Sequence, residues 1–79
     1  MLKPIASEKA VKLVDLENTL LFETDRARTK TQISIEVAKL FNVKVAKVRT
    51  LTRNNKKYAY VKLAKENPAI DVATKLGMI

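Results

Sequence analysis

The sequence contains no cysteine and no histidine, and its single glycine is Gly77. These absences exclude disulfides, a thiol nucleophile, the usual zinc ligands and a histidine general base. One glycine is too few for a glycine-rich phosphate loop. No apolar run approaches the ~20 residues that span a membrane, and the N-terminus lacks the pattern of a signal peptide. The sequence therefore predicts a cytoplasmic protein with no metal ion or other cofactor and no membrane insertion.

An enzyme is also disfavoured by the residues that are present. The carboxylates, among them Asp25, Glu36 and Asp71, show no paired spacing suited to acid–base catalysis. Ser7 and Ser34 have no histidine to activate them. A small enzyme that holds a phosphoryl group with arginine and asparagine alone is the one catalytic alternative, and it would need an anion-cradling loop that this chain does not provide.

The length and composition fit one small globular domain over residues 1–79. Apolar residues make up 47% of the chain and charged residues 30%, which is typical of folded rather than disordered proteins. A chain this short buries only about 60% of its unfolded surface, so we expect one modest core and no deep pocket.

Positive charge is concentrated in the middle of the chain. The whole sequence has 16 Lys and Arg against 8 Asp and Glu, but residues 26–65 hold twelve cations and one anion, Glu36. Such a block predicts a cationic plate that faces a polyanion such as nucleic acid. The alternative is a lysine-rich soluble surface, although thermostable surfaces usually interleave both signs of charge.

The pattern of apolar residues predicts the order helix, strand, helix, strand, strand, helix. The expected elements are a helix from Ser7 to about Asn18, a strand over 19–24, a helix from Thr29 to about Asn42, strands over 43–53 and 57–63, and a helix that begins at Pro68 and is capped by Gly77. The inward side chains of the last two helices are expected to be Ile33, Val37, Leu40 and Phe41, then Ile70, Ala73 and Leu76. This order predicts an α+β two-layer sandwich, with a three-stranded antiparallel sheet and the helices on one face.

Asn54 and Asn55 are suited to a two-residue type I′ turn because asparagine tolerates positive φ. With that turn, one face of the hairpin carries eight residues without an acid: Lys47, Arg49, Leu51, Arg53, Lys56, Tyr58, Tyr60 and Lys62. Like charges then lie opposite one another, which destabilises a sheet unless solvent or a bound anion screens them. The two tyrosines either stack on unpaired bases or simply cover the sheet through cross-strand contacts.

The start of the second predicted helix carries Arg26, Arg28 and Lys30 around the capping Thr29. Cations are unfavourable at the positive end of a helix dipole, whereas free N–H groups and cations together suit a phosphate. The alternative is that these are solvated side chains paired with Asp25 or Glu23.

Four segments together resemble the large-subunit ribosomal protein L23 family: PIASEKA at 4–10, NTLLFETDRARTK at 18–30, VAKLFNVKVAKVRTL at 37–51 and NKKYAYVKL at 55–63. The resemblance runs from Pro4 to the C-terminus. It implies a structural protein beside the exit of the nascent-peptide tunnel that binds large-subunit ribosomal RNA, chiefly its third domain, and neighbouring ribosomal proteins. The short segment Arg53 to Lys56 matches archaeal-type members, whereas many bacterial relatives have a long basic loop there.

The resemblance also implies where the partners bind. The family's basic stretches match Arg26 to Lys30, Arg49-Thr50 and Lys56 to Tyr58, and its factor-docking patch matches Ser7, Glu8 and Lys9. Glu8 is equally suited to complement the dipole of its own helix. Factors docking there would include the signal recognition particle. With the hairpin face, the expected RNA-binding residues are Arg26, Arg28, Thr29, Lys30, Lys47, Arg49, Thr50, Arg53, Asn54, Asn55, Lys56, Lys57, Tyr58, Tyr60 and Lys62. A free-standing nucleic-acid-binding or RNA-chaperone module is the alternative function.

Overall fold

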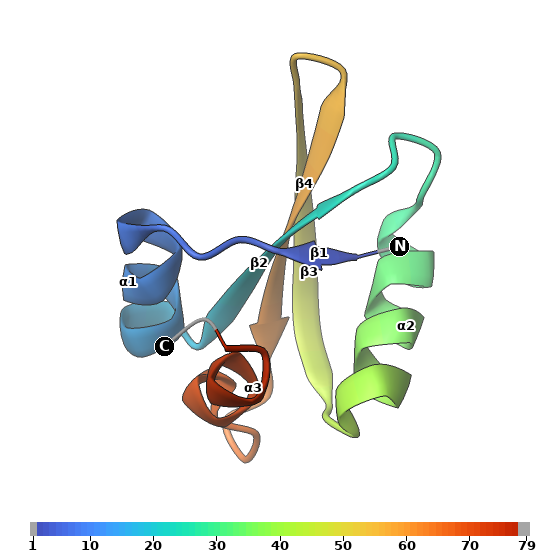
Figure 1. Ribbon diagram of the computed structural model, residues 1–79. Coiled ribbons are helices and arrows are strands. Elements are labelled where there is room, and N and C mark those ends of the chain that lie inside the picture. The colour runs from blue at the N-terminus through green and yellow to red at the C-terminus, as the bar shows by residue number, and fades with distance from the viewer. Residues whose placement is uncertain (1, 78–79) are drawn as a thin grey trace.

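A computed structural model describes residues 2–77 of the chain. These residues form three helices and four strands: β1 (Lys3–Pro4), α1 (Glu8–Glu17), β2 (Thr19–Thr24), α2 (Lys30–Phe41), β3 (Val45–Arg53), β4 (Lys56–Leu63) and α3 (Ala69–Lys75). The α+β class is therefore confirmed. The strands form one antiparallel sheet in the order β1-β2-β4-β3, so β4 lies between β2 and β3 (Figure 1).

The prediction of three strands is wrong by one short strand. Lys3 and Pro4 pair with Glu23 and Phe22 and add β1 to the edge of the sheet. A two-residue strand is too short to show a periodic pattern in the sequence. Its proline fits an edge strand, because proline has no N–H to donate and is confined to sheet edges.

Helices α1 and α2 begin and end where their caps predict. Ser7 accepts a hydrogen bond from the N–H of Ala10, and Thr29 and Gln32 form a complete capping box at α2. Asn18 and Asn42 end α1 and α2 in the left-handed conformation, at φ 52° and 54°. Pro68 is the cap of α3 rather than its first residue, and Gly77 follows the helix with φ 75°.

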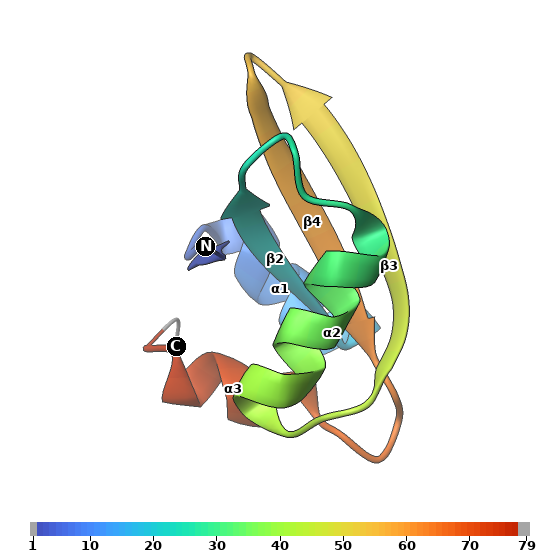
Figure 2. The same cartoon turned by 90° about the vertical axis from the view of Figure 1, so that its right-hand side faces the viewer.

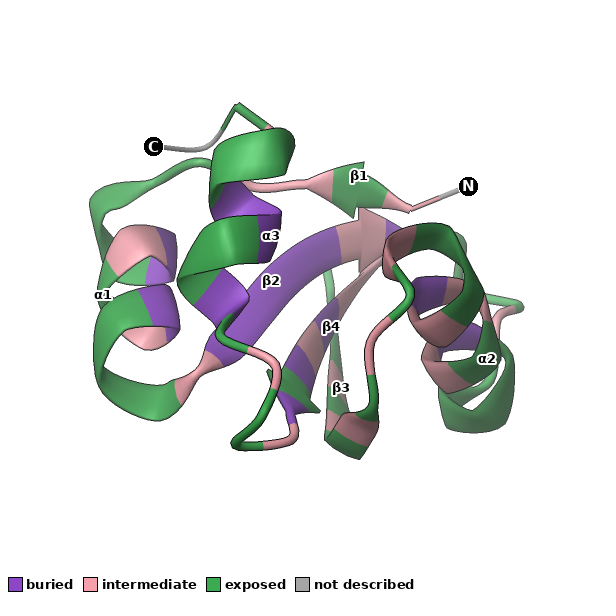
Figure 3. Cartoon of the chain, turned by 90° about the horizontal axis from the view of Figure 1, so that it is seen from below, coloured by how far each residue is buried: buried purple, intermediate pink, exposed green. Residues whose placement is uncertain are grey.

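The prediction that every helix covers one face of the sheet is wrong for α1. Helix α2 packs over β3 and β4, whereas α1 lies on the other side of the sheet, against β2 (Figure 1). As a result β2 is covered on both faces. Leu20 and Phe22 face the main core, and Leu21 is buried on the opposite face; Figure 3 shows burial along most of the strand.

The core joins side chains from all three helices and the two central strands. Its fully buried members include Phe22, Leu20, Ile33, Val37, Val61 and Leu63. The ring of Phe41 is stacked on Phe22 with centroids 6.3 Å apart. Two predicted core residues are instead exposed, Leu40 at 62% and Ile70 at 45%; on α3 the buried residues are Ala69, Val72 and Ala73.

The end of α1 is tied to the end of β4 by the side chain of Asn18. Its Nδ2 lies 3.2 Å from the carbonyl oxygens of Leu63, Ala64 and Asn67, and its Oδ1 accepts a 2.6 Å hydrogen bond from the N–H of Ala69. One side chain therefore fixes the start of α3 relative to the sheet.

Candidate nucleic-acid interface

The hairpin formed by β3 and β4 projects beyond the rest of the molecule (Figures 1 and 2). Its turn is Asn54-Asn55, with φ of 52° and 64°, as a type I′ turn requires. The predicted register is confirmed: Arg53 is opposite Lys56, Leu51 opposite Tyr58, Arg49 opposite Tyr60 and Lys47 opposite Lys62. We call these eight residues of one face the hairpin patch.

The hairpin patch carries five cations, and two of its four cross-strand pairs bring like charges together. Two acids lie at its margin. Glu23 of β2 is 3.9 Å from the Nζ of Lys56, and Glu17 lines a shallow depression together with Lys47 and Lys62. All five cationic residues are exposed, so the patch keeps a surplus of positive charge at the surface.

Both tyrosines of the hairpin patch are half-buried and pack against the core. The guanidinium carbon of Arg49 lies 5.6 Å from the centre of the Tyr60 ring, within the range of a cation–π contact. Tyr58 lies between Leu51 of β3 and Glu23 of β2 in the register. Cross-strand packing therefore accounts for part of the surface of each ring, as the simpler sequence interpretation expected.

The hairpin tip meets the loop that leads into α2. Nη1 of Arg26 donates a hydrogen bond to Oδ1 of Asn55, with 3.2 Å between the two atoms. The Nζ of Lys57 donates a hydrogen bond to the carbonyl oxygen of Arg28. Two regions 29 residues apart in sequence, both predicted to bind RNA, thus form one surface. Figure 2 shows the loop and the hairpin side by side.

The N-terminus of α2 is less open to a phosphate than the sequence predicts. The N–H of Gln32 is already bonded to Oγ1 of Thr29, and the side chain of Gln32 returns to the N–H of Thr29. Arg28 forms an ion pair with Glu36 of α2. Both partners are about three-quarters buried, with 28% and 26% of their side chains exposed. Lys30 remains exposed and lines a depression beside Lys47.

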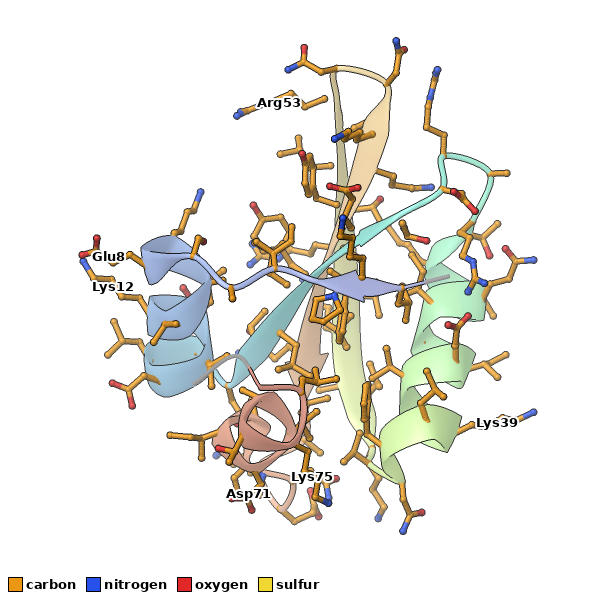
Figure 4. The ribbon with its side chains drawn as sticks, viewed as in Figure 1. Glu8, Lys12, Lys39, Arg53, Asp71 and Lys75 are labelled. Atoms are coloured by element: carbon orange, nitrogen blue, oxygen red, sulfur yellow. The ribbon has the colours of Figure 1, made fainter. Side chains whose placement is uncertain are left out.

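Not every predicted residue joins this surface. Thr50 is half-buried on the face opposite the hairpin patch, where it pairs with Ala59. Lys39 projects from α2 on the side of the molecule away from Arg53 (Figure 4). The cations of residues 26–65 therefore do not form a single plate; the hairpin patch and the neighbouring loop hold only part of them.

The predicted docking patch lies at the start of α1. Ser7 caps the helix, and the Glu8 side chain is 88% exposed, 3.8 Å from Lys12 of the next turn. The side chains of Glu8 and Lys12 extend away from the sheet (Figure 4). Lys9 differs, because it lines a groove together with Arg49 and Tyr60 of the hairpin patch. The sequence did not predict this proximity, because the first helix was expected on the opposite face of the sheet.

Two further features of residues 2–77 bear on function. No helix among them has the length and apolar character needed to cross a bilayer. Their acidic side chains do not gather into a group of three or more that would suit a metal ion.

Comparison with known proteins identifies relatives over nearly the whole chain. A family model described as "Ribosomal protein L23" matches residues 1–70. The chain is also 49% identical, over 76 residues, to the "Large ribosomal subunit protein uL23" of Pyrobaculum aerophilum. That alignment covers 95% of this chain and 94% of the relative.

Proposed function

This chain belongs to the ribosomal protein L23 family, and from this premise we propose that it binds the third domain of large-subunit ribosomal RNA near the exit of the polypeptide tunnel. Family membership makes it a structural constituent of the large ribosomal subunit, located on the ribosome. The family is not enzymatic, which confirms the exclusion of catalysis.

The observation that carries the RNA proposal is the pair of like-charged contacts within the hairpin patch. Arg53 opposite Lys56 and Lys47 opposite Lys62 each destabilise the free hairpin by up to about 1 kcal/mol. Phosphates laid across the strands turn this repulsion into attraction. An arrangement that is unfavourable in the free protein is therefore favourable in a complex with a polyanion.

Binding in this proposal is structural and involves no turnover. Contacts from lysine and arginine to phosphates supply most of the affinity, and they release counterions. The projecting hairpin recognises folded RNA through the shape of the RNA. The exposed side-chain amides of Asn54 and Asn55 offer hydrogen bonds to the RNA. We place Arg28 among the weaker contributors because Glu36 already neutralises it.

We further propose that the exposed start of α1 is where factors that meet the nascent chain dock, the signal recognition particle among them. The support is the exposure of Glu8 and its position away from the RNA-facing tip of the hairpin. Neighbouring ribosomal proteins would cover other parts of the surface.

The test is the salt dependence of binding to a fragment of the third domain of large-subunit RNA. We expect affinity to fall steeply with salt, and Arg49→Ala to make the slope of log K against log salt shallower by about one unit. Lys39→Ala is the matched control, since it removes one charge on the far side of the molecule and should change the slope little. Salt-independent affinity, or equal affinity for unrelated RNA of the same length, would contradict the proposal.

Sedimentation distinguishes this function from a free-standing nucleic-acid-binding module. A ribosomal constituent stays with large subunits through a gradient of moderate salt, whereas a free-standing module is released to the top. Recovery of the chain mainly away from large subunits would favour the second function.

A further inference from the structure

A groove of about 390 Å³ lies between α1 and the hairpin patch. Helix α1 contributes Lys9 and Leu13, and the hairpin contributes Arg49, Thr50, Leu51 and Tyr60. The groove exists because α1 lies on this face of the sheet, whereas α2 covers the opposite face. Leu13, Leu51 and Tyr60 give it an apolar and aromatic part, and its two charged groups are both cations.

We propose that this groove receives an unpaired nucleotide of the bound RNA, with the base against Leu13, Leu51 and Tyr60 and the flanking phosphates at Lys9 and Arg49. The inference rests on the proposed RNA-binding function and makes it more specific. It also reassigns Lys9 from protein docking to RNA.

The groove offers suitable partners for both the base and the phosphate of a nucleotide. A base presents an apolar face that stacks on aromatic side chains and on guanidinium planes, and both are present in Tyr60 and Arg49. The cation–π contact holds the guanidinium of Arg49 beside the ring, so the charge that meets the phosphate is already positioned.

A second depression, of about 210 Å³, continues the groove along the hairpin patch. It shares Arg49 and Tyr60 with the first and adds Lys47 and Lys62, with Glu17 at its margin. The cations of the two depressions, Lys9, Arg49, Lys47 and Lys62, thus follow one path. A row of cations beside an aromatic ring is the arrangement that proteins use to follow a single strand.

Two features favour an unpaired nucleotide over other occupants. In a duplex the bases are stacked on one another and cannot enter a groove from the side, so the strand must be single at this point. An apolar peptide segment would fill the walls, but it would leave Lys9 and Arg49 without partners unless it also carried acids.

The first experiment measures binding of the full chain to a fluorescently labelled uridine pentanucleotide at low salt. Tyr60→Leu keeps apolar bulk but removes the ring, and we expect it to lower affinity about tenfold, as loss of one stacked base does. Leu16→Ala is the control, because it removes an exposed apolar side chain of α1 that lies outside both the groove and the hairpin patch; it should change affinity less than twofold.

A second pair of variants tests the α1 wall and does not depend on the packing of Tyr60. Lys9→Gln should lower affinity for the pentanucleotide two- to threefold and reduce the salt slope by about one unit. Lys12→Gln, on the same helix but outside the groove, should leave both unchanged. Thermal melting of all four variants checks that each is folded. Because Lys9 is exposed, its replacement should leave the fold intact, so this pair still tests the groove if Tyr60→Leu unfolds.

Ultraviolet crosslinking within intact large subunits provides the last measurement. We expect a nucleotide adduct on Tyr60 or on the peptide containing Lys9 and Leu13. If the third-domain fragment binds normally while both groove variants behave as their controls, the groove inference fails and the proposed function stands. If the unmodified chain does not bind that fragment, the proposed function itself fails. Preference of the groove for an acidic apolar peptide over the pentanucleotide would also overturn the inference.

Discussion

Replacing Asn18 with glycine should remove a large part of the stability of this domain without altering its backbone. Glycine adopts the left-handed conformation of this position, φ 52°, at no steric cost, so only the side-chain hydrogen bonds are lost. Those bonds join the end of α1 to the last residues of β4, to the following loop and to the first residue of α3.

The magnitude follows from the number of bonds. The two amide hydrogens satisfy at most two of the three carbonyls within 3.2 Å, and Oδ1 accepts one further bond from Ala69. At about 0.5–1.5 kcal/mol for each of these bonds, we expect a loss of about 2–4 kcal/mol in the free energy of unfolding. A domain of this size has roughly 4–12 kcal/mol in total. The melting temperature should fall by roughly 10–25 °C.

Urea denaturation followed by circular dichroism measures this loss, and Asn42→Gly is the control. Asn42 ends α2 at nearly the same φ, 54°, but its side chain makes none of the hydrogen bonds found within residues 2–77. Its replacement should change the free energy of unfolding by no more than about 0.5 kcal/mol. Equal effects of the two substitutions would refute the reasoning, because the Asn18 amide would then contribute nothing beyond its backbone conformation.

Four further substitutions test the packing, the capping box and the turn. Ile33→Ala should cost roughly 2–5 kcal/mol of unfolding free energy and exposed Leu40→Ala less than about 0.5; similar values in urea would place Leu40 back in the core. Thr29→Ala removes the capping hydrogen bond of α2 and should cost about 1 kcal/mol, so an unchanged urea midpoint would argue against the capping box. Asn55→Gly relieves positive φ at the hairpin turn and should raise stability by up to about 1 kcal/mol; a lower melting temperature would show that the bond from Arg26 outweighs that relief.

Local signals in the sequence predicted most of the fold. The caps at Ser7 and Thr29 and the Asn54-Asn55 turn each depend on neighbouring residues alone, so they were correctly located along with the hairpin register. Long-range features were less accessible. Helix α1 has enough apolar residues for one buried stripe, but its periodicity does not tell which face of the sheet the stripe packs against. The two-residue β1 gives no pattern at all.

In the candidate site, too, local features were predicted from the sequence and long-range contacts were not. Alternation along β3 and β4 predicted which side chains share the hairpin patch, because the turn fixes the register. The partners of individual charges were not predictable from spacing. If paired, Arg28 was expected near Asp25 or Glu23, but its ion-pair partner is Glu36 of α2, eight residues further along the chain. Glu23 lies beside Lys56, a residue distant in sequence.

The position of β3 has a consequence for copies of the protein that have not yet been assembled. This nine-residue strand is an outer strand of the sheet, and such a strand offers unpaired backbone groups to any other strand it meets. Lys47, Arg49 and Arg53 along it, and the irregularity between Val45 and Lys47, oppose self-association and aggregation. The charges on which the proposed RNA binding depends thus also keep newly made chains apart.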